Sequence, residues 1–299
     1  VQHCSLTAPR IDHVIHSGVI RPRKLCIDPD RGSAVVAGAS VEKASLTSDE
    51  DTTVYSNTGD SATDMTLSLT TGDLFLATGK KRQLLTCRMG SESFHETMTF
   101  TRSVRVLALD EVRQRLAVGL AGGAIKLIRT SDNTTLNSIP TGHAHISALA
   151  FEPKTGRLAC GNDDGEIIIL DSNSQPVSRV QAHQGPVTKV TFSSDGKHLA
   201  STSHDRRVRI IDLDDSANEV SIKLSRERVR TLAFSPDSQT IAIGGADRDI
   251  RPCDAKTGEL QATLGGHSDA VTDLAFSADG QSLFSLSLDG TLRRWRPQP

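Results

Sequence analysis

A phrase of alternating apolar and polar residues recurs at nearly constant spacing along this 299-residue chain. Clear copies read VTKVTF, VRTLAF and VTDLAF. The copies open 41 or 42 residues apart, each on one apolar residue: Val104, Ile146, Val187, Val229 and Val271. Counting back by about the same interval reaches Ala62 and Pro22, where the phrase is degraded. The spacing predicts seven units that begin near residues 22, 62, 104, 146, 187, 229 and 271.

Each unit has the residue pattern of short β-strands. In TKVTFSSDGKHLASTSHDRRVRIIDL (188–213), three runs of period two are separated by turn residues. A fourth run follows in the sixth unit as ELQATLGGH. No segment keeps an apolar period of 3.6 residues long enough for an independent helix. We therefore predict an all-β fold, a seven-bladed β-propeller of four-stranded antiparallel blades that occupies residues 1–299 as a single domain.

The seventh unit supplies residues for only three strands before Pro299. The segment IDHVIHSG (11–18) is a counterpart of LQATLGGH, the outer strand of unit six. We expect residues 1–18 to form a leader whose strand completes the last blade. Such a closure removes the exposed edges that an open ring would leave.

Composition excludes several classes of protein. The net charge of −2 favours neither nucleic acid nor a membrane surface. The five cysteines are scattered and include no CxxC pair, which indicates a reduced, intracellular protein. No apolar run approaches the length of a membrane helix, and no signal peptide is visible. The chain starts at Val1 rather than methionine, which we interpret as a partial or trimmed chain.

Residues at fixed places in the last four units carry a family resemblance. GGH (265–267) and QAH (181–183) precede first strands, Asp205 and Asp289 lie in turns, and RRWR (293–296) forms a third strand. These motifs resemble the WD-repeat family of β-propellers. The resemblance implies that a His, a Ser or Thr, an Asp and a Trp hydrogen-bond within a blade. It assigns a structural role to His143, Asp164, His183, Ser201, Asp205, His267, Ser285, Asp289 and Trp295.

Units two to four carry a second, narrower resemblance. Residues 71–119, from TGDLFLATG to QRLAVG, and IKLIRTSDNTT (125–135) are similar to the N-terminal propeller of the chromosome-transmission-fidelity replisome adaptor family. The resemblance implies a nuclear protein that tethers polymerase and helicase at the replication fork. It also implies trimerisation through a C-terminal domain that is not in this chain.

No residue pattern supports an enzyme, a metal site or a cofactor. Ser, His and Asp recur together in several units, whereas a catalytic triad is needed only once, so they indicate buried polar networks. TGKKR (78–82) lacks the first glycine of a phosphate-binding loop. HAH (143–145) has no third ligand at a suitable spacing for a metal.

Basic residues flank the openings of units one, three and six. In a propeller these positions lie at the mouth of the central channel, so we expect a basic surface that binds an acidic or phosphorylated segment of another protein. The predicted partner-binding residues are Arg21, Arg23, Arg102, Arg105, Arg226, Arg228 and Arg230. A DNA-binding propeller and a ubiquitin-ligase substrate receptor are the alternatives. The predicted function is a protein-interaction scaffold in replication or chromatin, located in the nucleus.

Overall fold

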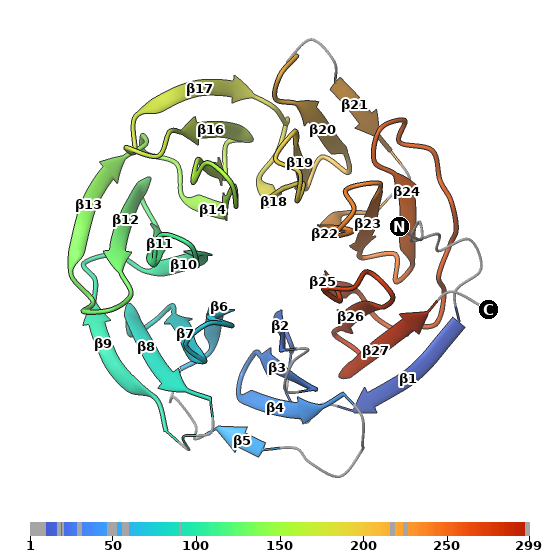
Figure 1. Ribbon diagram of the computed structural model, residues 1–299, viewed down its shortest axis with the longest axis horizontal. Helices are drawn as coiled ribbons and strands as arrows, with labels where there is room; N and C mark the ends of the chain where they lie inside the picture. The colour runs from blue at the N-terminus through green and yellow to red at the C-terminus, as the bar shows by residue number, and fades with distance from the viewer. Residues whose placement is uncertain are drawn as a thin grey trace.

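The computed structural model describes residues 10–16, 19, 21–28, 32–46, 53–55, 60–89, 91, 93–215, 219–223 and 227–296. Within these ranges the regular elements are all strands. Seven antiparallel sheets surround a central axis, each with its first strand innermost (Figure 1). The all-β, seven-bladed propeller predicted from the repeat is confirmed.

The first four blades contain four strands each. Blade 1 has β2 (Lys24–Asp28), β3 (Ser33–Ala37), β4 (Val41–Ser45) and β5 (Thr53–Tyr55). Blade 2 has β6 (Ala62–Leu67), β7 (Asp73–Thr78), β8 (Gln83–Arg88) and β9 (His95–Thr99). Blade 3 has β10 (Val104–Asp110), β11 (Arg115–Leu120), β12 (Ala124–Arg129) and β13 (Thr135–Pro140). Blade 4 has β14 (Ile146–Phe151), β15 (Leu158–Asn162), β16 (Glu166–Leu170) and β17 (Pro176–Gln181).

The last three blades differ in how the outer strand is supplied. Blade 5 has β18 (Val187–Phe192), β19 (His198–Ser203), β20 (Val208–Asp212) and β21 (Glu219–Ile222). Blade 6 has β22 (Val229–Phe234), β23 (Thr240–Gly245) and β24 (Ile250–Asp254). Blade 7 has β25 (Val271–Phe276), β26 (Leu283–Ser287) and β27 (Thr291–Arg296), with β1 (Arg10–His16) outermost.

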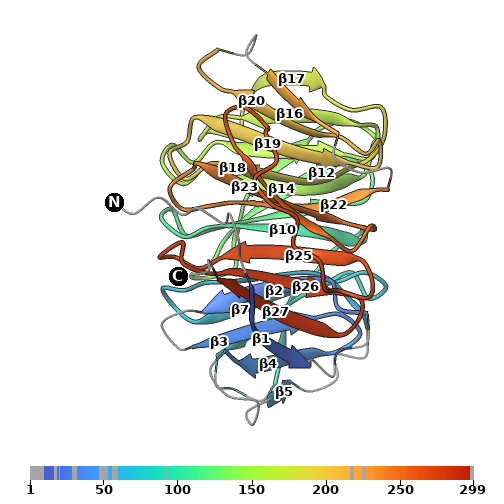
Figure 2. The same cartoon turned by 90° about the vertical axis from the view of Figure 1, so that its right-hand side faces the viewer.

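The ring closes through β1. This strand pairs antiparallel with β27, from Arg10 opposite Arg296 to His16 opposite Thr291, as Figures 1 and 2 show at the rim of blade 7. The closing strand was expected at residues 11–18, of which 17 and 18 lie outside the described residues. Blade 7 therefore combines strands from opposite ends of the sequence, and β27 is paired on both sides.

The outer side of blade 6 is less regular than the four-stranded pattern predicts. Residues 259–264 contact β24 through two isolated bridges, Ile250 with Leu264 and Cys253 with Leu260. Pro252 lies between these bridges and has no N–H to donate to the outer segment. Its carbonyl still accepts the N–H of Gln261 at 2.9 Å. One proline thus interrupts the outer ladder of this blade.

The core is a series of apolar layers between neighbouring blades. Ile125 of blade 3 and Leu149 of blade 4 share one layer, and Phe284 of blade 7 and Leu25 of blade 1 share another. Close approach requires a glycine on some second strands: a Cβ on Gly161 would lie 2.5 Å from Val187 Cγ1. The residue that opens a unit therefore packs against the blade before it, which explains why it is always apolar.

Candidate functional site

A ring of side chains lines the channel because the first strands bulge there. In blades 2 to 7 the register of the first strand slips directly after its opening residue. A bulge leaves one residue unpaired and re-aims its side chain. These bulge residues line the central channel, together with Arg23, which precedes the regular β2 of blade 1. We call the set the upper ring: Arg23, Thr63, Arg105, Ser147, Thr188, Arg230 and Thr272.

The hydroxyl groups of the upper ring are engaged by the backbone. Thr63, Ser147, Thr188 and Thr272 each donate a hydrogen bond to a carbonyl oxygen over 3.0–3.4 Å. Their protons are not free for a ligand. The side-chain donors that the upper ring offers to a ligand are therefore the guanidinium groups of Arg23, Arg105 and Arg230.

Two ion pairs lie one residue deeper in the channel. Lys24 Nζ is 3.2 Å from Asp64 Oδ1, and Lys189 Nζ is 3.1 Å from Asp273 Oδ1. Burial alone would raise the pKa of Asp273, but Lys189 and Lys24 outweigh it and hold that pKa below its ordinary value. Asp273 therefore stays ionised and paired with Lys189 at neutral pH.

The same two aspartates join consecutive blades. Asp64 Oδ2 accepts the N–H of Leu107 at 2.7 Å, and Asp273 Oδ2 accepts the N–H of Leu25 at 3.1 Å. The second bond links blade 7 to blade 1 and so adds to the closure made by β1. Sequence reasoning missed these residues; the available signal was a charged residue at the third position of the repeated phrase, as in VTDLAF.

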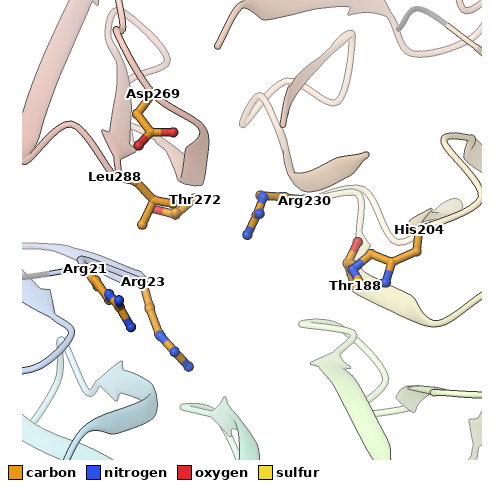
Figure 3. Close-up of a pocket in the computed structure, with 8 residues that line it drawn as sticks. All are labelled: Arg21, Arg23, Thr188, His204, Arg230, Asp269, Thr272 and Leu288. Atoms are coloured by element: carbon orange, nitrogen blue, oxygen red, sulfur yellow. The ribbon is translucent and has the colours of Figure 1, made fainter. Parts of the chain in front are cut away.

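A cavity of about 560 Å³ opens at the mouth of the channel, on the side where the first strands begin. Figure 3 shows its lining residues: Arg21, Arg23, Thr188, His204, Arg230, Asp269, Thr272 and Leu288. In that view Arg23 and Arg230 point into the space between their blades. We call this the mouth cavity.

The three arginines of the mouth cavity have unused hydrogen-bonding capacity. Arg21, Arg23 and Arg230 are exposed, and none of their guanidinium groups bonds to any residue that the structure describes. Burial lowers the pKa of His204, and the positive charges of Arg228 and Arg230 lower it further, so this imidazole is neutral near pH 7. Asp269 also lines the cavity.

The other predicted arginines are distributed differently. Arg105 lines the channel, with Nη2 3.6 Å from Asp163 Oδ2. Arg228 is exposed but lines neither the mouth cavity nor the channel, and Arg102 lies beside Gly122 in blade 3. Arg226 lies outside the described residues. The structure thus brings together Arg21, Arg23 and Arg230 at the mouth, with Arg105 just inside.

The residues of the WD-type polar networks line neither the mouth cavity nor the channel. His267 Nδ1 is 2.9 Å from Asp289 Oδ2, His267 Nε2 is 2.7 Å from Ser285 Oγ, and Trp295 Nε1 donates to Ser285 Oγ at 2.8 Å. Burial lowers the pKa of His267 despite Asp289. The imidazole is therefore neutral, donates to the carboxylate and accepts from Ser285, whose oxygen in turn accepts from the indole.

His183 lies in the loop between blades 4 and 5 and makes the corresponding contacts with blade 5. Its Nδ1 is 2.9 Å from Asp205 Oδ2 and its Nε2 is 2.9 Å from Ser201 Oγ. Ile211 stands where the tryptophan would be, so this network ends at the serine. His183 and Ser201 are buried, which keeps both groups from water and from any substrate.

The network expected at His143 and Asp164 is not formed. Both residues are exposed, and no hydrogen bond or ion pair joins them. The backbone N–H of Thr141 donates to Gly123 O at 2.8 Å, as that of His183 does to Gly165 O. Thr141 therefore takes the place of the histidine, and the loop that leads to Ile146 is one residue longer than its counterpart before Val187. His143 lies in that loop.

Among the described residues, no group of His, Cys, Asp or Glu is arranged to hold a metal ion. Cys87, Cys160 and Cys253 are buried thiols, and burial raises the pKa of each. No helix in the described part of the chain is long and apolar enough to cross a membrane.

Comparison with known proteins points to one family. A family model described as WD domain, G-beta repeat matches residues 134–171, 174–212, 221–251 and 258–296. A WD repeat-containing protein of Schistosoma mansoni, SL1-17, is 31% identical over 100 residues, which are 33% of each chain. The human WD repeat domain phosphoinositide-interacting protein 1 is 30% identical over 36% of this chain and 25% of its own.

A third relative is the LST8 homolog of Dictyostelium discoideum, which is 30% identical over 24% of this chain and 26% of its own. The chain thus spans a third or less of the length of each of these three relatives. The four matched repeats fall on blades 3 to 7, where the buried His–Ser–Asp networks also lie. With seven blades and four matched repeats, the chain belongs to the WD-repeat family of β-propellers.

Proposed function

We propose that this propeller is a non-catalytic protein-interaction module that binds an acidic or phosphorylated peptide segment at the mouth cavity. The observation that carries the proposal is the convergence of Arg21, Arg23 and Arg230 on one cavity with no bonded carboxylate among the described residues. Guanidinium groups with free donors suit capture of a carboxylate or phosphate. WD propellers typically bind other proteins, which agrees with a peptide as the ligand.

The polarity of the lining favours a peptide over a small metabolite. Sites for small molecules are predominantly apolar with a few polar groups. Of the residues that line the mouth cavity, only Leu288 is apolar. Asp269 is the only carboxylate in that lining. Its Oδ1 accepts the N–H of Ala270 at 2.6 Å, so this carboxylate is bonded within its own loop and not to an arginine of the cavity.

We further propose that the partner is a replication or chromatin protein in the nucleus. The support for this setting is the resemblance of residues 71–119 and 125–135 to the replisome adaptor family. Direct DNA binding is the weaker alternative, because no Phe, Tyr or Trp lines the mouth cavity to stack on an unpaired base. A ubiquitin-ligase receptor would carry arginine two residues after the third-strand Asp; Asn173, Asp214 and Lys256 stand there.

A peptide-binding experiment tests the proposal. Fluorescence anisotropy with labelled acidic and phosphorylated peptides, at about 50 and about 300 mM salt, should give hits that weaken as salt rises. Arg21→Glu is the most informative variant because Arg21 lines the mouth cavity but not the channel. We expect it to weaken each hit by about tenfold or more.

The matched control is Arg88→Glu, which alters an exposed arginine at the end of β8 that lines neither cavity. It should leave the affinities unchanged. If Arg21→Glu and Arg88→Glu have equal effects, the mouth cavity is not the binding site. If labelled duplex DNA binds and no peptide does, the alternative replaces the proposal.

A further inference from the structure

We infer that the central channel, below the mouth cavity, contains a binding site for a single phosphate-class dianion, formed by Arg23, Arg105 and Arg230. These arginines come from blades 1, 3 and 6 and line one cavity of about 160 Å³. The site lies inside the ring, whereas the proposed peptide lies at its mouth. Arg23 and Arg230 line both cavities, whereas Arg105 lines the channel alone and Arg21 the mouth alone, so variants of Arg105 and Arg21 test the two proposals separately.

The channel carries an excess of positive charge. Five cationic side chains line it against two carboxylates. Those carboxylates, Asp64 and Asp273, are bonded to Lys24 and Lys189. The three arginines have no carboxylate partner within the channel, although Arg105 pairs with Asp163 outside it. Arginine remains protonated in proteins. An anion that enters would be attracted more strongly than in bulk water, because the cavity is partly enclosed.

The channel cavity is the smaller of the two cavities. Its volume is about 160 Å³, against about 560 Å³ for the mouth cavity. A phosphate group or the phosphorylated tip of a side chain is compact enough for this space.

The arrangement of donors selects a tetrahedral group over a planar one. A single guanidinium can satisfy a carboxylate by paired hydrogen bonds in one plane. Here the three guanidinium groups line one cavity and belong to blades 1, 3 and 6, which Figure 1 shows separated around the ring. A phosphate presents oxygens in several directions and carries a charge of about −1.5 to −2 at neutral pH. It can therefore engage all three arginines at once.

The depth of the site is set by the residues around the arginines. The hydroxyls of the upper ring donate to the backbone and leave the arginines as the ring's free donors. One residue deeper, Lys24 and Lys189 are already paired with Asp64 and Asp273, so that layer attracts an anion less than the arginines do. Asp163, 3.6 Å from Arg105, competes weakly for one guanidinium.

Calorimetric titration with inorganic phosphate, in chloride buffer of constant ionic strength, tests the site. We expect saturable binding of one phosphate per chain. Arg105→Gln should weaken it by between about tenfold and about a hundredfold, the range for a hydrogen bond to a charged group. Asp163→Asn should strengthen it by up to about fivefold, because it releases Arg105 from an exposed ion pair. Arg88→Gln should change nothing.

The opposite signs of the Arg105 and Asp163 variants separate a ligand site from general damage to the fold. The fold of each variant is checked by the fluorescence of Trp295, which is buried in blade 7. If phosphate does not bind to the unaltered chain, or binds equally to Arg105→Gln, the inference is wrong. Arg21→Glu should weaken peptides but not inorganic phosphate, so failure of the peptide proposal and failure of this one give different results.

A competition experiment identifies the source of the phosphate group. Inorganic phosphate is observed by ³¹P NMR while a phosphoserine peptide or its unphosphorylated form is added. Displacement by the phosphopeptide alone supports the site and assigns it to a phosphorylated side chain of a partner. Binding of phosphate that neither peptide displaces supports the site and assigns it to a free phosphate compound.

Discussion

Replacement of Asp289 by alanine removes four hydrogen bonds from blade 7 at once. Asp289 Oδ2 accepts from His267 Nδ1 and Ser268 N, each at 2.9 Å. Its Oδ1 accepts from the N–H of Thr291 at 2.9 Å and from Thr291 Oγ1 at 2.6 Å. His267 and Ser285 are buried, so the imidazole N–H that the substitution leaves behind has no access to water.

The size of the effect follows from which groups can find a new partner. A buried donor without an acceptor costs about 1–3 kcal/mol. Ser268 is exposed and can bond to water, whereas His267 can only turn to Thr291 Oγ1, which is 3.2 Å from Nδ1. We therefore expect a loss of about 2 kcal/mol in the free energy of unfolding. Asp247→Ala should cost less than about 1 kcal/mol, because its partner Arg251 keeps Asp249.

Urea unfolding measures both losses in the same assay. The chain has one tryptophan, Trp295, whose indole donates to Ser285 within the network, so its fluorescence reports on blade 7 directly. Circular dichroism, which reports on the strands of all seven blades, provides the second probe. If Asp289→Ala and Asp247→Ala shift the midpoint equally, the buried network does not stabilise the blade as argued.

Three further changes have defined outcomes. Deletion of residues 1–17 removes β1 and exposes the edge of β27, so it should lower the melting temperature by several degrees and promote aggregation; an unchanged melt contradicts this closure. Gly161→Ala should cost about 1–3 kcal/mol by overpacking against Val187, whereas Gly185→Ala, whose Cβ would lie 3.4 Å from its nearest neighbour, should be tolerated. Burial holds the pKa of His183 and His267 below the ordinary 6.5, so the unfolded chain binds protons that the folded chain does not. Stability should be complete above about pH 6.5 and fall below it, and His267→Gln should flatten the slope of the urea midpoint between about pH 6.5 and 5.

The fold could be predicted because the repeat reflects packing. The residue that opens each unit fills a layer between two blades, as Val187 does against Gly161, so its place in the sequence is fixed by the geometry of the ring. Loops are not fixed in this way. One additional residue between Thr141 and Ile146 moved His143 out of the network position, and spacing along the chain could not reveal it.

The site was harder to predict because it depends on contacts across the ring. Asp273 accepts from Leu25, 248 positions away, and pairs with Lys189 from a blade that is not its neighbour. A linear pattern shows that these residues are charged but not that they meet. The arginines were easier to find, since they flank the openings of their units, yet only the bulges determine that Arg105 and Arg230 line the channel.

The bulge explains how a repeated framework can carry a function that is not repeated. The opening residue of each unit is constrained by packing between blades, so it is apolar in every unit. The bulge residue pairs with nothing and lines the channel, so a threonine, a serine or an arginine fits there equally well. Arginine at blades 1, 3 and 6 and hydroxyl residues at the other four give a symmetric scaffold an asymmetric charge. The position that matters least for folding is therefore the one at which a binding preference can be set.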